Sequence, residues 1–316
     1  MVNFWKKLKK PILILAPMAN VTDAAFRGII AKYGKPDVFW TEFVSANGLV
    51  SEGKNKLLAD LKFSKKERPI VAQLFTGDPE NLAKAAKLVT KLGFDGLDFN
   101  IGCPDRSIEK SGAGAVLIKN SKLAKELIRV MKANTRLPVS VKTRIGYAAI
   151  DLDWIKDLLE ENLDALAIHL RTRKEMSGVP AHWELIPKII ELRDKISPGT
   201  LIIGNGDVAT PKEAIEKCKK YKCDGVMIGR GIFGNPWLFS KKKKEVALAE
   251  KLKALIEHIR LFDKYFRGVK NFAVMKKHFK AYVSGFDNAK DLRIKLMGVN
   301  TAKEAGKIIR DFLVEV

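Results

Sequence analysis

A cysteine marks the first residues of this chain that could do chemistry. Cys103 follows Asn100-Ile101-Gly102 and precedes Pro104, directly after the apolar run Gly96–Phe99. Because proline ends a strand, we expect the thiol at the carboxyl end of a buried strand, where barrel enzymes keep their reactive groups. Free cysteines also pack as small hydrophobic residues, so the position alone leaves catalysis and packing both open.

The elements that must position this thiol recur along the chain. Short β-rich apolar runs alternate with amphipathic segments, such as 79–92 and 121–134, whose apolar residues recur at helical spacing. This alternation predicts a parallel sheet, and eight units favour a closed (β/α)8 TIM barrel over an open doubly wound sheet. The expected strands are 12–16, 38–41, 70–74, 96–99, 139–142, 165–169, 201–204 and 225–228.

The pattern changes after Phe239. The run Lys241–Lys244, which we interpret as a solvated linker or helix start, opens a region without strand signals. Helices are expected over 246–265, 269–284 and 301–316. We therefore predict a barrel domain over 1–240 and a C-terminal all-helical domain over 241–316.

The charge of the chain is strongly positive. It carries 58 Lys and Arg against 36 Asp and Glu, a net charge of +22, and residues 241–316 hold 19 of the basic residues against 9 acidic ones. This predicts a polyanionic partner, most simply nucleic acid, although basic charge also serves plain solubility.

The cysteines and the N-terminal segment indicate in which cellular compartment the protein occurs. Cys103, Cys218 and Cys223 show neither a paired framework nor metal-ligand spacing, and the four histidines add none. The apolar run near the N-terminus, 11–18, is far too short to span a membrane. We expect a cytoplasmic protein without a disulfide, a metal site or a membrane anchor.

Two strand ends resemble a phosphate cradle. Asn205-Gly206-Asp207 and Gly229-Arg230-Gly231 follow the seventh and eighth strands, where barrels bind phosphate through exposed backbone amides and a cation, here Arg230. Each glycine turn is weak evidence alone, because such loops need glycine for their backbone conformation.

Three more strand-end residues have polar side chains. Gln73 and Lys142 can hold the polar edge of a flat heterocycle, and His169 can act as a base or ligand. The structural alternatives stay open. They are a hydrogen bond inside the barrel mouth for Gln73, a salt bridge to Glu42 or Asp98 for Lys142, and a backbone bond for His169.

Taken in order, these strand ends resemble the tRNA-dihydrouridine synthases. The matching segments are 16–23, 73–77, 100–104, 141–144, 169–173, 204–207 and 227–231, with 275–282 in the C-terminal region. The Asn-x-Gly-Cys-Pro motif at 100–104 and the C-terminal helix are specific, whereas the Asn-Gly-Asp and Gly-Arg-Gly turns occur in many flavin barrels.

The resemblance implies an FMN enzyme that uses NADPH, or NADH, to reduce the 5,6 double bond of uridines in tRNA. It implies Cys103 as the acid that protonates carbon. The implied FMN contacts are Pro17, Met18, Ala19, Gln73, Lys142, His169, Asn205, Gly206, Asp207, Gly229 and Arg230. The implied contacts to uridine or tRNA are Asn100, Arg144, Arg171, Lys276, Lys277 and His278.

Two positions depart from the family pattern. Leu170 stands where a small residue is usual, and His182 replaces the acid of a common Ala-Asp-Trp segment. Two other functions remain as alternatives: a flavin barrel of the dihydroorotate-dehydrogenase or old-yellow-enzyme kind, and an RNA-binding barrel without chemistry. We expect a monomer.

Overall fold

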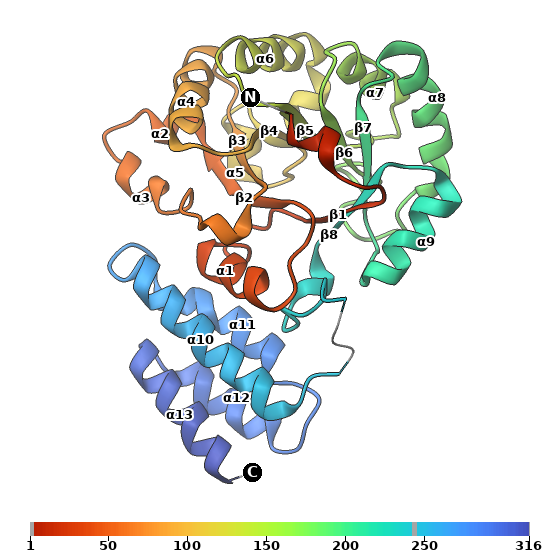
Figure 1. Cartoon of the computed structure of the whole chain (residues 1–316). Coiled ribbons are helices and arrows are strands. Elements are labelled where there is room, and N and C mark those ends of the chain that lie inside the picture. The colour runs from red at the N-terminus through yellow and green to blue at the C-terminus, as the bar shows by residue number, and fades with distance from the viewer. Residues whose placement is uncertain (1–2, 242–244, 316) are drawn as a thin grey trace.

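Eight parallel strands alternate with helices through the first three quarters of the chain (Figure 1). The computed structural model describes residues 3–241 and 245–315. The strands are β1 (Ile12–Leu15), β2 (Phe39–Ser45), β3 (Ile70–Phe75), β4 (Gly96–Ile101), β5 (Val139–Arg144), β6 (Ala165–His169), β7 (Leu201–Asn205) and β8 (Gly225–Ile228). The sheet runs β1-β8-β7-β6-β5-β4-β3-β2, and a parallel bridge between Ile14 and Val38 brings its two edges together. The predicted barrel fold is therefore confirmed.

Alternating side chains divide the core of the barrel into an interior and an outer layer. Ile12, Ile14 and Ala16 point into the interior cluster, whereas Leu15 belongs to the layer between strands and helices. The short helix η1 (Phe4–Lys7) adds Trp5, whose ring lies 5.7 Å from that of Trp40 inside the barrel. This period-two alternation builds an apolar interior, while Gln73, Asp98 and Ser140 form a buried hydrogen-bonded group within β3, β4 and β5.

The connecting helices begin and end where local chemistry predicts. In α4 (Pro79–Leu92) the Asp78 side chain accepts from the backbone N–H groups of Glu80 and Asn81, and Gly93 ends the helix at a φ of 80°. The predicted helix over 121–134 is α6 (Ser121–Ala133). The other barrel helices are α1 (Ala24–Tyr33), α2 (Ala46–Leu49), α3 (Lys54–Leu58), α5 (Arg106–Lys110), α7 (Leu152–Leu159), α8 (Ile186–Ile196) and α9 (Pro211–Tyr221).

The C-terminal region holds α10 (Leu248–Phe266), α11 (Met275–Tyr282), α12 (Ala289–Gly298) and α13 (Ala302–Glu315). Three of these match the expected helices, although α11 is shorter than predicted, and the last expected residue, Val316, lies outside the described residues. The sequence missed α12 because Ile294 and Met297 are 62% and 45% exposed, which blurs its apolar stripe. The domain boundary near residue 240 stays a prediction, and Lys242–Lys244 of the four-lysine run lie outside the described residues.

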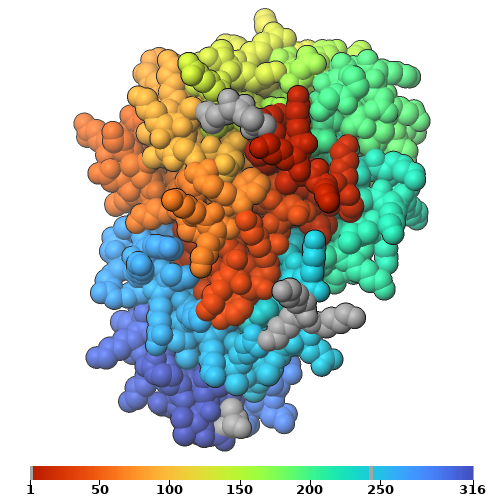
Figure 2. Space-filling view, viewed as in Figure 1, coloured from red at the N-terminus to blue at the C-terminus, as the bar shows by residue number. Residues whose placement is uncertain are grey.

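The C-terminal helices pack directly against the barrel through α1 (Figure 2). Phe26 of α1 stacks on His258 of α10, with ring centroids 5.0 Å apart, and lies 4.7 Å from His278 of α11. The His278 side chain is fully buried there. The expected contact between His278 and tRNA is therefore wrong for this structure, because a side chain inside the interface cannot reach RNA.

Candidate active site at the carboxyl end of the barrel

A cavity of about 670 Å³ opens where the carboxyl ends of β1, β5, β6, β7 and β8 meet. It collects the following residues expected from the sequence: Pro17, Met18, Lys142, His169, Arg171, Asn205, Gly206, Asp207, Gly229 and Arg230. Residues far apart in the chain meet here because all strands of a parallel barrel end at one rim. Ala19, Gln73, Asn100, Cys103 and Arg144 lie outside this lining.

Glycines on one side of the cavity let its turns pack closely against neighbouring segments of the chain. A Cβ on Gly206, whose φ is 128°, would lie 2.7 Å from the Cβ of Ala181, and one on Gly231 would lie 2.3 Å from the carbonyl oxygen of Ala209. Arg230 extends beside them with a 70% exposed side chain, 3.5 Å from a carboxylate oxygen of Asp207. Close backbone and a loosely paired cation form a cradle suited to a phosphate group.

Arg171 connects this cradle to His169. Its guanidinium pairs with Asp207 and lies 3.3 Å from Nε2 of His169, and its Nε donates to the carbonyl of Val179 at 2.5 Å. Because arginine only donates, Nε2 of His169 accepts and the ring proton lies on Nδ1. Burial, followed by the nearby cation Lys142, lowers the pKa of His169 to about 2. The imidazole is therefore neutral at physiological pH.

Lys142 faces the cavity without a carboxylate partner. Burial lowers its pKa to about 8. Within residues 3–241 and 245–315 it forms no ion pair, because Glu42 pairs with Lys270 at 2.9 Å and Asp98 accepts from Gln73 at 2.7 Å. The salt-bridge alternative for Lys142 is thus not formed, and its ammonium is available to a ligand.

Gln73 and Asn100 shape the turn that carries the cysteine. Asn100 donates to the amide oxygen of Gln73 at 3.0 Å, and its own amide oxygen accepts from the backbone N–H groups of Gly102 and Cys103, each at 3.0 Å. Gln73 is fully buried, and its amide nitrogen donates to the carboxylate of Asp98. Both amides therefore help to position the cysteine turn, and neither is among the residues that line the cavity. The expected contacts of Gln73 with the cofactor and of Asn100 with the substrate stay predictions.

Cys103 is half-buried beside this turn. Its carbonyl accepts from the backbone N–H of Ala115 at 2.9 Å, which fixes the residue from the other side. Burial raises the pKa of the thiol above its ordinary value. A protonated thiol at neutral pH suits an acid better than a nucleophile, because nucleophilic cysteines need a lowered pKa.

Arg144 connects the cysteine turn to the loop after β6. Its Nε donates to the carbonyl of Gly102 at 2.9 Å, and its Nη1 donates to the carbonyls of Thr172 and Met176 at 3.1 and 3.2 Å. These bonds use Nε and Nη1 of the guanidinium. Arg144 therefore holds two loops together.

Sequence reasoning missed the lining residues Ser177, Val208 and Ala209. Val208 and Ala209 directly follow the Asn-Gly-Asp turn. No spacing signal marks Ser177, because its place depends on how Arg144 and Arg171 hold the loop. No cluster of metal-ligating residues occurs in the part of the chain that the structure describes.

The chain matches the family model of dihydrouridine synthases over residues 14–316. It is 44% identical over 314 residues to a probable tRNA-dihydrouridine synthase of Staphylococcus aureus strain MRSA252, covering 98% of this chain and 95% of that protein. It is 42% identical to a probable tRNA-dihydrouridine synthase 2 of Bacillus subtilis strain 168, covering 98% and 96%. The chain belongs to the dihydrouridine synthase family. It is thus an oxidoreductase, as the sequence indicated.

Solved structures confirm the fold of this dihydrouridine synthase. Histamine dehydrogenase from Rhizobium sp. 4-9 superposes with a TM-score of 0.55 at 13% identity, over 79% of this chain and 48% of that one. Morphinone reductase in complex with tetrahydroNAD gives a TM-score of 0.51 at 14% identity, over 72% and 84%. At such low identity the likeness concerns the barrel fold alone. No described helix of the chain is long and apolar enough to cross a membrane.

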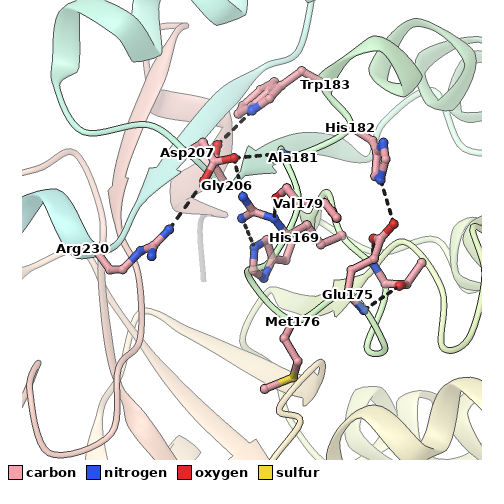
Figure 3. Close-up of polar contacts among 12 residues, drawn as sticks. His169, Glu175, Met176, Val179, Ala181, His182, Trp183, Gly206, Asp207 and Arg230 are labelled. Atoms are coloured by element: carbon pink, nitrogen blue, oxygen red, sulfur yellow. Dashed lines mark hydrogen bonds and ion pairs between the residues drawn. The ribbon is translucent and has the colours of Figure 1, made fainter.

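One departure of this dihydrouridine synthase from the family pattern has a structural role. The imidazole of His182 lies 3.0 Å from Glu175 (Figure 3). It also lies 3.2 Å from Glu184, and Glu175 accepts from the backbone N–H of Thr172 at 2.7 Å. Glu175 therefore raises the pKa of His182. The Glu175–His182 clasp closes the loop over 172–182, which borders the cavity.

Proposed function

We propose that this dihydrouridine synthase reduces the 5,6 double bond of uridines in tRNA, with FMN as the bound cofactor and NADPH as the reductant. The observation that carries the proposal is the cavity with a glycine cradle on one side and an unpaired Lys142 on the other. The printed names of relatives at 42 to 44% identity, probable tRNA-dihydrouridine synthases, support tRNA as the substrate.

The residues present fit FMN. Gly206, Gly229 and Arg230 would hold its phosphate, because they line the cavity together and Arg230 supplies a cation. Pro17 and Met18 would border the ring, and the ammonium of Lys142 would favour negative charge at its polar edge. FMN bound there would supply, after reduction by NADPH, the hydride for C6 of the uracil.

Cys103 is the acid in this proposal. Its Sγ–H bond breaks as a C–H bond forms at C5 of the uracil, and the thiolate then regains a proton from solvent. The raised pKa of Cys103 supports this role, because the thiol remains protonated at neutral pH. Asn100 acts through Cys103 as a positioning residue.

Neutral His169 and the cation of Lys142 face the same space. The Nδ1–H of His169 would donate to the uracil, and Lys142 would stabilise negative charge that develops when hydride arrives. The target base must leave the stack of a folded tRNA to reach this cavity. The basic C-terminal helices, including Lys276 and Lys277, would hold phosphates during that step.

The test is direct. The purified holoprotein is incubated with unmodified tRNA and NADPH, with NADH in parallel, and dihydrouridine is measured by nucleoside mass and mapped by position. We expect dihydrouridine at defined positions. Absence of product from every tRNA, although FMN is bound, would contradict the proposal.

A further inference from the structure

The backbone that carries Cys103 leads directly into a short helix. The side chain of Asp105 accepts from the backbone N–H groups of Ser107 and Ile108 at 2.9 and 3.3 Å and so begins α5. Pro104 and Asp105 alone lie between Cys103 and this helix. A displacement of α5 therefore moves the thiol as well, because two residues leave little chain to absorb it.

Arg173 contacts this segment from the loop after β6. Its Nε and Nη2 donate to the two carboxylate oxygens of Glu109 in α5 at 2.9 and 2.5 Å, and Nη2 also donates to the carbonyl of Pro104 at 3.3 Å. Two bonds between one guanidinium and one carboxylate fix orientation as well as distance. The side chains of Arg173 and Glu109 are 21% and 11% exposed, so water and salt screen the pair only partly. The pair therefore holds the segment that follows the thiol against the loop after β6.

The loop after β5 holds Arg173 in turn. The backbone N–H of Arg173 donates to the carbonyl of Gly146 at 2.9 Å, and that of Lys174 donates to the carbonyl of Tyr147 at 2.9 Å. The guanidinium of Arg173 also lies 5.8 Å from the centre of the Tyr147 ring, within the range of a cation–π contact. Arg173 therefore reaches Glu109 from a backbone that is itself anchored to the barrel.

The cysteine turn is thus held on both sides of the thiol. Before the thiol, Nε of Arg144 donates to the carbonyl of Gly102 at 2.9 Å. After it, Arg173 bonds to Pro104 and Glu109. Arg173 is not among the residues that line the cavity of the barrel. Its position therefore suits a role exerted through the cysteine, without contact with a bound ring.

We propose that Arg173, through its pair with Glu109 and its bond to Pro104, is a positioning residue that keeps the thiol of Cys103 where it protonates the substrate. The proposal rests on the proposed function of Cys103 as the acid. A general acid must lie within hydrogen-bond reach of the atom that receives its proton, and a misplacement of about 1 Å can cost about 100-fold in rate. Arg173 and Glu109 themselves neither give nor take a proton in the reaction.

The experiment compares Arg173→Met, Glu109→Gln and the double variant with Arg129→Met. Arg129 makes the same two-point contact with Glu161, at 2.9 and 2.8 Å, but Glu161 precedes β6 and lies at the opposite end of the strands from the cysteine. The control thus loses an equivalent ion pair away from the thiol. Single-turnover oxidation of the reduced holoprotein by saturating unmodified tRNA is measured, together with tRNA affinity and the rate of FMN reduction by NADPH.

We expect Arg173→Met and Glu109→Gln each to slow the oxidation of the reduced holoprotein by tRNA about 10- to 100-fold. The double variant should be no slower than either, because the two side chains act as a unit. Arg173→Lys should restore part of the rate, since an ammonium still pairs with Glu109 but lacks the two-point geometry. Affinity for tRNA and reduction by NADPH should match those of Arg129→Met.

A second readout depends on the thiol itself. When Cys103→Ala has already lowered the rate, adding Arg173→Met should lower it no further, because no thiol remains to be positioned. A merely structural role of Arg173 would slow both backgrounds alike. A further loss in the Cys103→Ala background would therefore overturn the inference.

Two other outcomes would also overturn it. One is turnover by Arg173→Met and Glu109→Gln equal to that of Arg129→Met. The other is weaker tRNA binding by Arg173→Met with normal turnover by Glu109→Gln, which would make Arg173 a contact to RNA. Full turnover by Cys103→Ala would instead contradict the proposed acid, so the failure of that role and the failure of the positioning role are distinguishable.

Discussion

The barrel cavity and a groove of about 590 Å³ between α10 and the start of α13 are both lined by cations, but these cations differ in their partners. At the barrel, Arg144 and Arg171 are only 6% and 3% exposed and donate to loop carbonyls or to Asp207. In the groove, Arg260 and Arg310 are exposed and form no ion pair with the described residues. The net charge of +22 therefore includes cations that hold loops in place and cations that remain available to a ligand. The two regions therefore differ in the hydrogen-bond and ion-pair partners of their arginines more than in the number of charges.

Removing the thiol of Cys103 tests turnover separately from tRNA binding. We expect Cys103→Ala to lower turnover on tRNA by at least about 100-fold, because a positioned general acid contributes about that much. The affinity for tRNA and the flavin absorption spectrum should stay unchanged. Single-turnover oxidation of the reduced holoprotein by tRNA measures this. Full activity would end the assignment of Cys103 as the acid.

The next comparison concerns the two arginines that contact Asp207, the buried Arg171 and the exposed Arg230. Arg171→Met should lower the free energy of unfolding of the apoprotein by about 2 kcal/mol, because Asp207 and the carbonyl of Val179 lose a buried donor. Arg230→Met should change it by less than about 0.5 kcal/mol, since that side chain is 70% exposed, and should weaken FMN binding instead. Urea unfolding and FMN titration distinguish the two, and equal unfolding effects would break the distinction.

A third prediction concerns the buried histidines between the barrel and the helices. Burial lowers the pKa of His278 to about 3 and that of His258 well below its ordinary value. The unfolded chain therefore binds more protons than the folded one below about pH 6.5, and stability is lost as the pH falls from there. At pH 5 the loss is about 2 kcal/mol for each imidazole.

The matching variant is His278→Leu. We expect its free energy of unfolding to depend less on pH between 6.5 and 5 than that of the wild type, with tRNA affinity unchanged. Urea unfolding at both pH values and tRNA binding at neutral pH provide the readouts. A large loss of tRNA affinity in a folded variant would return His278 to the RNA-contacting residues.

The smallest effect is expected at the Glu175–His182 clasp, which holds the loop by a titratable contact. Because Glu175 raises the pKa of His182, the clasp contributes stability below pH 6.5 and loses it as the pH rises through the raised value. The contribution is below about 1 kcal/mol, since both side chains are partly exposed. His182→Gln should remove this pH dependence from proteolytic cleavage within 172–182, and an unchanged pH profile would argue against the clasp.

Much of the barrel was predictable because the sequence patterns that specify its strands are local. All eight strands lie within a few residues of the predicted ranges, since apolar runs and the glycine or proline that ends them are read from neighbouring positions. The meeting of the Asn-Gly-Asp and Gly-Arg-Gly turns at one cavity was predictable for the same reason. Helix α12 was not, because Ile294 and Met297 interrupt its apolar stripe on the surface.

The candidate site was predictable in its members and less so in their roles. Gln73 and Asn100 were expected at cofactor and substrate, yet they bond to each other and to the cysteine turn. His278 was expected on RNA and lies inside the interface. These roles depend on which of several possible partners a polar group meets, and motif spacing does not encode that choice.

By itself, the sequence determined the alternation that closes into a barrel, the strand end that carries Cys103 and the family to which the motifs belong. Only the tertiary structure decided that Lys142 lacks a carboxylate partner among the described residues and that Lys270 pairs with Glu42 of β2. Lys270 and Glu42 are 228 residues apart in the chain. Contacts at such separation form only when the two parts of the molecule pack, because no local pattern in the chain specifies them.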